Sequence, residues 1–122
     1  MPNIQNQILI VEDERPLAKA LELKLSQAGF GVKSVYNGRE AIDELGKAPA
    51  DLVLLDLLMP ETDGWEVLKW LHGRGIKVVV ISNLNQEEDV QRAKELGAED
   101  FWVKSNLSLS DIVEKITAIL RR

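Results

Sequence analysis

The sequence predicts a single α/β domain of (βα)5 type: a five-stranded parallel sheet, doubly wound, with helices on both faces. Short apolar runs alternate along the 122 residues with segments in which apolar residues recur at helical spacing. Two of the runs, LVLL (52–55) and VVVI (78–81), contain no polar residue, which is typical of strands buried on both faces. Alternating strands and helices favour a parallel sheet covered on both sides.

Each predicted strand is a short run rich in β-branched or large apolar residues. In chain order the runs are ILIV (8–11), VKSV (32–35), LVLL (52–55), VVVI (78–81) and FWV (101–103). The polar residues 1–7 precede the first run, so we expect a flexible tail there and one domain over 8–122.

Between and after these runs, apolar residues recur three or four positions apart, the spacing of a helix that buries one face. In chain order these stripes are Leu17, Leu21, Leu25 and Ala28; Ala41, Ile42 and Leu45; Val67, Leu68 and Leu71; Val90, Ala93 and Leu96; and Ile112, Val113, Ile116, Ile119 and Leu120. Gly29, Gly46, Gly73 and Gly97 predict where the first four helices end, and Ser110 is the predicted N-cap of the last.

Composition limits the possible functions. The net charge of −5 argues against direct binding to nucleic acid. The absence of cysteine excludes disulfides and thiolate metal sites. No apolar run approaches the length of a membrane span, and the polar start is unlike a signal peptide. We therefore expect a cytoplasmic protein that does not bind membranes.

Charged or hydroxyl side chains follow four of the predicted strands. Glu12 and Asp13 follow the first strand, Asp56 the third, Ser82 the fourth and Lys104 the fifth. The carboxyl ends of parallel strands meet at one edge of the sheet, where such folds bind ligands. With the strand order 2-1-3-4-5, the three carboxylates converge.

Three converging carboxylates repel one another unless a cation neutralises them. Oxygen ligands of this kind suit Mg²⁺, with Mn²⁺ as a substitute. A carboxylate held there can act as a nucleophile toward phosphorus, and Lys104 and the Ser82 hydroxyl can then hold the transferring oxygens. The strand formed by the apolar run before Asp56 thus places the Asp56 carboxylate at the edge of the sheet, beside the predicted metal site.

Four motifs in order resemble the receiver domain of two-component response regulators, a flavodoxin-like fold shared with chemotaxis regulators. They are VEDE (11–14), DLLMPETDG (56–64), VVVISN (78–83) and GAEDFWVKS (97–105). Together they span nearly the whole chain, and four in the family's order are far more specific than any one alone.

The resemblance implies a role for each residue at the edge of the sheet. Asp56 would accept a phosphoryl group from the phosphohistidine of a sensor histidine kinase or phosphotransfer protein. Asp13, Asp56 and the backbone carbonyl of Leu58 would ligate Mg²⁺ directly, and Glu12 would act mostly through water. Lys104 would contact the phosphoryl group.

The resemblance also implies a switch. Ser82 would swing toward the phosphoryl group and Phe101 would follow inward, altering the face formed by the fourth helix, the fifth strand and the fifth helix. That face would control a partner, an output domain outside this chain, or a phosphorylation-dependent homodimer. Such a protein catalyses its own phosphorylation and dephosphorylation but is not a conventional turnover enzyme.

Other readings of these residues stay open at this stage. Asp56 could be a helix-cap or turn residue, and Asp13 could cap the first helix. Lys104 could be a solvated charge, and Phe101 could be an ordinary core aromatic. An alternative function is a protein-interaction module that keeps the receiver fold but signals without phosphorylation.

Two enzyme or carrier classes are excluded by single features. A haloacid dehalogenase needs a second aspartate at position 58, where this chain has leucine. A flavin carrier needs a phosphate loop after the first strand, where EDERP (12–16) is largely acidic.

The chain departs from the family pattern near the site. Ser105 stands where the family usually has proline after the closing lysine, often with a cis bond. Asn83 replaces the usual small residue after the switch hydroxyl. Leu58 and Leu84 offer no group to orient an attacking water, so we expect slow hydrolysis of the phosphorylated form.

Overall fold

The computed structural model describes residues 6–59, 64–84 and 86–121. Strands and α-helices alternate within them, and a short 3-10 helix, η1 (Lys104–Asn106), precedes the last α-helix. The strands are β1 (Gln7–Val11), β2 (Gly31–Val35), β3 (Leu52–Leu55), β4 (Lys77–Ser82) and β5 (Asp100–Val103). The α-helices are α1 (Arg15–Gln27), α2 (Gly38–Lys47), α3 (Gly64–Leu71), α4 (Glu87–Glu95) and α5 (Leu109–Leu120).

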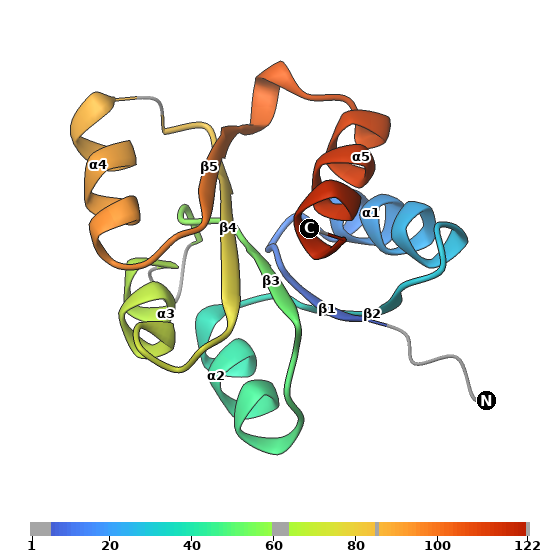
Figure 1. Ribbon diagram of the computed structural model, residues 1–122, viewed down its shortest axis with the longest axis horizontal. Helices are drawn as coiled ribbons and strands as arrows, with labels where there is room; N and C mark the ends of the chain where they lie inside the picture. Colours follow the sequence, from blue (N-terminus) through green and yellow to red (C-terminus); the bar gives the residue numbers. More distant parts are fainter. Residues whose placement is uncertain (1–5, 60–63, 85, 122) are drawn as a thin grey trace.

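The strands form one parallel sheet in the order β2-β1-β3-β4-β5, which confirms the predicted architecture (Figure 1). The central strand β3 is buried along its whole length, as its unbroken apolar run indicates. The first strand, β1, lies between β2 and β3, so the chain passes across β1 on its way from β2 to β3. The ends of β1 and β3 therefore lie side by side.

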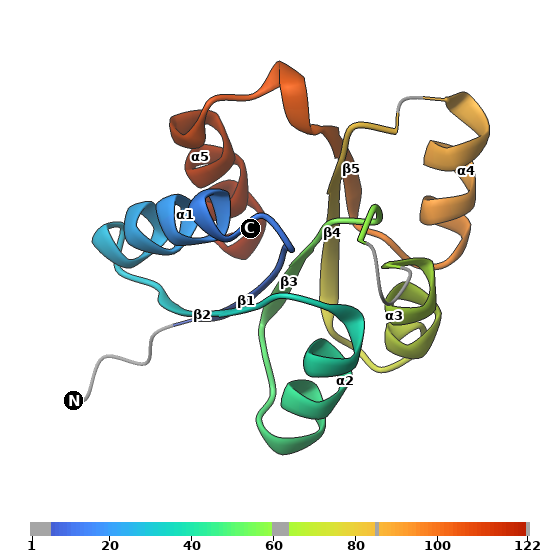
Figure 2. The ribbon, with the colours of Figure 1, turned by 180° about the vertical axis from the view of Figure 1, so that it is seen from behind.

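Helices cover both faces of the sheet. Figures 1 and 2 show α1 and α5 on one face and α2, α3 and α4 on the other. Alternate strand residues feed two separate cores: Leu54 packs with Leu21 and Ile116 under α1 and α5, whereas Leu55 packs with Leu68 under α3. The two cores hold the strands rigidly, so the residues just past each strand are placed by the sheet.

Some element ends differ from the prediction. The strand β1 begins at Gln7, the last residue of the predicted tail, and residues 1–5 of that tail lie outside the described residues. Gly29 and Gly97 follow α1 and α4 with φ of 99°, as a helix-ending glycine does. Gly46, by contrast, lies within α2, which continues to Lys47.

The predicted N-cap of the last helix is wrong. The cap is Ser108, whose hydroxyl accepts a hydrogen bond from the backbone N–H of Asp111. The Asp111 carboxylate accepts in return from the N–H of Ser108, which completes a capping box. Ser110 therefore lies inside the first turn of α5.

Among the described helices, none is long and apolar enough to cross a membrane.

Candidate functional site

The pairing of β1 with β3 brings the acidic residues together. Val11 and Leu55 are the last paired residues of the two strands, and the N–H of Asp56 donates to the carbonyl of Val11 at 3.0 Å. Glu12 and Asp56 therefore leave neighbouring strands at the same level. Oxygens of Glu12, Asp13 and Asp56 lie within 4.8 Å of one another, as the sequence predicts.

Asp56 is 3 % exposed, and both of its carboxylate oxygens accept hydrogen bonds. Oδ1 accepts from the backbone N–H of Leu58 at 3.0 Å, and Oδ2 accepts from Nζ of Lys104 at 3.0 Å. The hydrogen bond from the Leu58 N–H is the contact that a turn aspartate makes, but a turn role alone does not account for the second contact, with Lys104. The Asp56 carboxylate is fixed in direction by one main-chain donor and one cation.

Lys104 reaches into the cluster from the far end of β5. Its Nζ lies 2.7 Å from Oε1 of Glu12 as well as 3.0 Å from Asp56, and only 13 % of its side chain is exposed. A third carboxylate, that of the exposed Glu14, lies 3.4 Å from the same ammonium. Lys104 is therefore a paired residue and not a solvated charge.

Burial dominates the electrostatics of the two buried carboxylates. It raises the pKa of Glu12 from 4.5 to about 7, against the hydrogen bonds from Lys104 and the Glu14 N–H. Burial also raises the pKa of Asp56, which the Leu58 N–H and Lys104 oppose without offsetting. Burial by itself lowers the pKa of Lys104, but its hydrogen bonds to Glu12 and Asp56 outweigh this and leave the pKa raised.

The directions of these pKa shifts reflect an excess of negative over positive charge at the site. The ammonium of Lys104 is well neutralised because two buried carboxylates face it, so its pKa rises. Each carboxylate has only a share of that one cation, so the cost of burial prevails and its pKa rises too. Glu12 and Asp56 together carry one negative charge more than Lys104 balances, and Asp13 adds another beside them.

The residues present fit a divalent cation. All three clustered side chains offer carboxylate oxygens, the donors that Mg²⁺ prefers, and the cluster has excess negative charge. Oε1 of Glu12 is buried, and the ammonium of Lys104 is its only polar partner among the described residues. A buried oxygen in that state is available to accept from a metal-bound water.

The predicted switch residues lie on β4 and β5. Ser82 is fully buried at the end of β4, and its hydroxyl accepts from the N–H of Leu84 at 3.2 Å. Phe101, on β5, is half-buried and packs against the core under α3 and α4. Leu58 is 51 % exposed, and only its N–H is engaged with Asp56.

Two features of the site escaped the sequence analysis. The contact of Glu14 with Lys104 was not predicted, and Glu14, not Asp13, is the N-cap residue of α1, with no side-chain cap. A hydrogen bond from the Ser105 N–H to Oδ1 of Asn83 joins two departures from the family pattern. The described residues contain no cis peptide bond, so the Lys104–Ser105 peptide is trans.

Part of the third strand's motif cannot be placed. Positions 60–63, which include its proline and second aspartate, lie outside the described residues. Gly64, its last residue, starts α3 and donates its N–H to the carbonyl of Leu57 at 3.2 Å.

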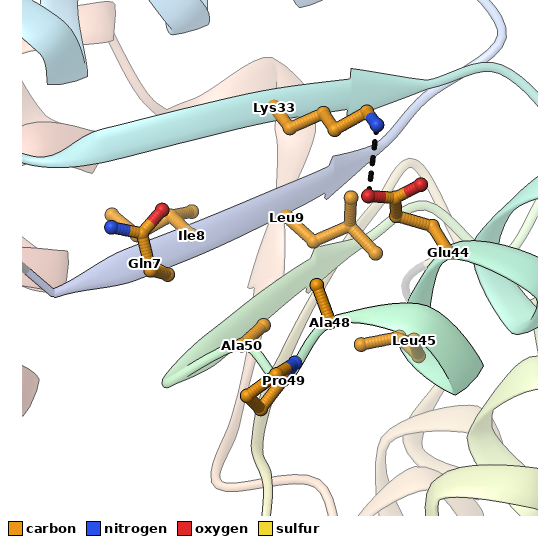
Figure 3. Close-up of a pocket in the computed structure, with 9 residues that line it drawn as sticks. All are labelled: Gln7, Ile8, Leu9, Lys33, Glu44, Leu45, Ala48, Pro49 and Ala50. Atoms are coloured by element: carbon orange, nitrogen blue, oxygen red, sulfur yellow. Dashed lines mark ion pairs between the residues drawn. The ribbon is translucent and has the colours of Figure 1, made fainter.

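A separate pocket lies near the amino ends of the strands, away from the carboxylates. It encloses about 80 Å³ between the start of β1, β2 and the end of α2 (Figure 3). Lys33 and Glu44 form a 2.8 Å ion pair at its edge, and Leu9 and Leu45 supply apolar lining. The charged side chains among its lining residues are Lys33 and Glu44, which are paired with each other, so the carboxylate cluster is the better candidate site.

Comparison with known proteins bears on the whole chain. The sensory transduction protein RegX3 of Mycobacterium tuberculosis and Mycobacterium bovis is 39 % identical over 116 residues, or 94 % of this chain. The match covers 51 % of RegX3, so the chain spans about half the length of these curated relatives.

Solved structures agree with the fold. A two-component response regulator from Clostridium difficile superposes with a TM-score of 0.90 at 28 % identity, covering 97 % of this chain and 98 % of that one. A CheY-like receiver domain protein from Methanospirillum hungatei shares the fold, with a TM-score of 0.89, 24 % identity and coverage of 96 % and 94 %. The sequence model of the response regulator receiver domain matches residues 8–117. The chain therefore belongs to the response regulator receiver domain family of two-component systems.

Proposed function

We propose that this receiver domain accepts a phosphoryl group on Asp56 from the phosphohistidine of a sensor histidine kinase or phosphotransfer protein. The observation that carries the proposal is the setting of Asp56. It is buried at the end of β3, next to two further carboxylates and 3.0 Å from the ammonium of Lys104. Buried carboxylates with strongly shifted pKa values cluster at functional sites, which supports a functional role for Asp56.

The chemistry is a phosphoryl transfer between two side chains. An Asp56 oxygen forms a bond to phosphorus as the P–N bond of phosphohistidine breaks, and the electron pair of that bond stays on the imidazole. The product on this chain is an acyl phosphate. Lys104 already lies against Oδ2 of Asp56, so its ammonium is placed to contact the oxygens of the incoming group.

The metal in this proposal is Mg²⁺, with Mn²⁺ as a substitute. Asp13, Asp56 and the backbone carbonyl of Leu58 would hold it directly, and Glu12 would contact it through water. When bound, Mg²⁺ supplies positive charge that neutralises the carboxylates and the transferring oxygens. Asp13 is half-buried, so it is more open to solvent than Glu12 and Asp56.

In this proposal, phosphorylation of Asp56 changes the surface formed by α4, β5 and α5. Once Asp56 is phosphorylated, the Ser82 hydroxyl would leave Leu84 for a phosphoryl oxygen, and Phe101 would turn inward. The apolar ring of Phe101 carries no hydroxyl to desolvate, so this movement costs little. The face formed by α4, β5 and α5 would then bind a partner, an output domain or a second copy of the chain.

The signalling pathway extends beyond this chain. RegX3 is described as a sensory transduction protein, and this chain matches about half of it. We infer that the domain acts in the cytoplasm between a kinase and an output. Its own catalytic part is limited to gaining and losing the phosphoryl group, without turnover of a separate substrate.

The test is intact mass after incubation with acetyl phosphate, with and without Mg²⁺. We expect wild type to gain one phosphoryl group only when Mg²⁺ is present, and Asp56→Asn to gain none. Asp43→Asn, which changes an exposed aspartate of α2, is the matched control and should behave as wild type. No gain by wild type would overturn the proposal and favour an interaction module that works without phosphorylation.

A further inference from the structure

A side chain links the loop after β4 to the turn after β5. Oδ1 of Asn83 accepts a hydrogen bond from the backbone N–H of Ser105 at 3.0 Å. Asn83 directly follows Ser82, and Ser105 directly follows Lys104. The two residues proposed to contact the phosphoryl group are therefore joined through their chain neighbours.

The bond lies where the backbone ladder between β4 and β5 stops. The last paired residues of these strands are Ser82 and Val103. One step further, β5 turns into η1, and the chains no longer pair as strands. The Asn83 side chain supplies an acceptor there. The segments that follow β4 and β5 are therefore joined by one more hydrogen bond beyond the last strand pair.

This bond fixes the turn that carries Lys104. The side chain of Lys104 is held at its tip by Glu12 and Asp56, and its main chain is held by β5 on one side. On the other side, η1 is a single 3-10 turn with no buried residue. Among the described residues, Asn83 is the only one whose side chain forms a hydrogen bond with the main chain of that turn.

We propose that Asn83 is a positioning residue for Lys104, acting through the Ser105 N–H. The proposal rests on the proposed function, because the ammonium that Asn83 positions is the one that would meet the phosphoryl group. Without the bond, the turn after β5 samples more conformations, and Lys104 is aimed at the acceptor for less of the time. Small misplacements of a group that stabilises a transition state slow the reaction.

The size of the effect is modest because both residues are exposed to solvent. Losing one net hydrogen bond of this kind corresponds to a loss of about threefold to tenfold in rate. The loss should appear in the limiting rate at saturating acetyl phosphate, and the donor concentration for half-maximal rate should change little.

Three variants separate the bond from other effects. Asn83→Leu keeps the size of the side chain but removes the acceptor. Asn83→Asp keeps the acceptor oxygen and should restore the limiting rate. Ser105→Ala removes only the hydroxyl, and it should behave as wild type because the donor is the backbone N–H. Ser105→Pro is unsuitable because a proline disfavours the helical conformation of the preceding residue, and Lys104 lies in η1.

The experiment measures each variant in three ways. Hydrogen exchange of the Ser105 amide, followed by NMR, reports the bond itself. The Nζ and Cε chemical shifts of Lys104 report how the ammonium is held. The limiting rate of phosphorylation by acetyl phosphate reports the consequence. For Asn83→Leu we expect faster Ser105 exchange, shifted Lys104 signals and a limiting rate lower by about threefold to tenfold.

Two results would overturn the proposal. One is unchanged Ser105 exchange in Asn83→Leu, which would mean that the bond does not protect this amide. The other is faster exchange with unchanged Lys104 signals, which would mean that the bond does not position the lysine. Both NMR measurements use unphosphorylated protein, so they decide the proposal even if wild type accepts no phosphoryl group. If wild type accepted no phosphoryl group, that result would contradict the proposed function but not the positioning of Lys104 by Asn83.

Discussion

The ammonium of Lys104 lies 3.0 Å from Oδ2 of Asp56, and the two side chains are only 13 % and 4 % exposed. They come from residues 48 positions apart in the sequence, brought together by the ends of β5 and β3. Glu12 shares the same ammonium at 2.7 Å, so one half-buried cation faces two buried anions. The site is therefore short of positive charge, and this shortage governs its stability and its response to metal.

Removing Lys104 should destabilise the metal-free protein strongly. In Lys104→Met the carboxylates of Glu12 and Asp56 lose their shared cation, and breaking a buried pair in this way costs about 3 kcal/mol. Urea unfolding in EDTA measures this loss of free energy of unfolding. Adding Mg²⁺ should recover part of it, because a ligand of the folded state alone stabilises that state.

The matched control for Lys104 is Lys33, which forms a 2.8 Å ion pair with Glu44 but is 61 % exposed. Lys33→Met should cost no more than about 0.5 kcal/mol, the usual size for an exposed pair. Equal losses in the two variants would contradict the view that burial makes the Lys104 pairs important.

The charge imbalance also predicts a pH dependence without metal. Burial raises the pKa of Glu12 from 4.5 to about 7, so the folded state binds a proton more tightly than the unfolded chain does. Stability should then fall as the pH rises from 4.5 toward 7 and stay low above it. Between pH 6 and pH 8 in EDTA the expected loss is about 1 kcal/mol, taking 1.36 kcal/mol for each pKa unit.

Other shifted groups do not obscure this window. Lys104, whose raised pKa lies above the range, keeps its proton throughout, and the lowered pKa of Asp111 acts only below pH 4. Burial also raises the pKa of Asp56, and a raised pKa lowers stability as the pH rises, so Asp56 acts in the same direction as Glu12. The control is Glu12→Gln, in which the loss between pH 6 and pH 8 should shrink markedly. A wild type that is more stable at pH 8 than at pH 6 in EDTA would contradict the prediction.

The sequence was sufficient for the fold and for the acidic cluster, for one physical reason. Short apolar runs mark the strands, and the carboxyl ends of parallel strands lie at one edge of the sheet, so Glu12, Asp56 and Lys104 were predicted to lie near one another there. The contacts of Glu14 and Asn83 involve exposed side chains on irregular backbone, where no periodicity constrains the direction of a side chain. These could be found only in the structure.

The start of α5 is an intermediate case, because a signal was present. The segment SLSD (108–111) offers two serines as caps. Only Ser108 has an acidic residue three positions later, the spacing of a capping box, and the structure uses it. The spacing of Ser108 and Asp111 was therefore a better guide than proximity to the apolar stripe.

Replacing each serine by alanine in turn tests whether Ser108 is the N-cap of α5. Ser108→Ala should lower the free energy of unfolding by about 1 kcal/mol, the usual cost of losing an N-cap. Ser110→Ala should change it little, because Ser110 lies within the first turn and is exposed. Chemical denaturation of both variants gives the comparison. A larger loss for Ser110→Ala would mean that the cap is at Ser110 after all.

At Gly64, the start of α3 closely approaches the backbone of Asp56 and Leu57. A Cβ at this position would lie 2.5 Å from the carbonyl oxygen of Asp56 and 2.5 Å from Cα of Leu57. Both are main-chain atoms, so relief requires the loop after β3 to move. Gly64→Ala should therefore destabilise the protein by about 1–3 kcal/mol, as overpacking does, and slow phosphorylation by displacing Asp56.

Gly46, the last residue but one of α2, is the matched control. A Cβ there meets nothing within 4 Å, and its φ is not positive. Gly46→Ala should stabilise the protein by about 0.5–1 kcal/mol, because alanine loses less conformational freedom than glycine in a helix. Urea unfolding and the rate of phosphorylation by acetyl phosphate measure both variants. If Gly64→Ala unfolded and reacted like wild type, the backbone that carries Asp56 would not depend on a glycine at the start of α3.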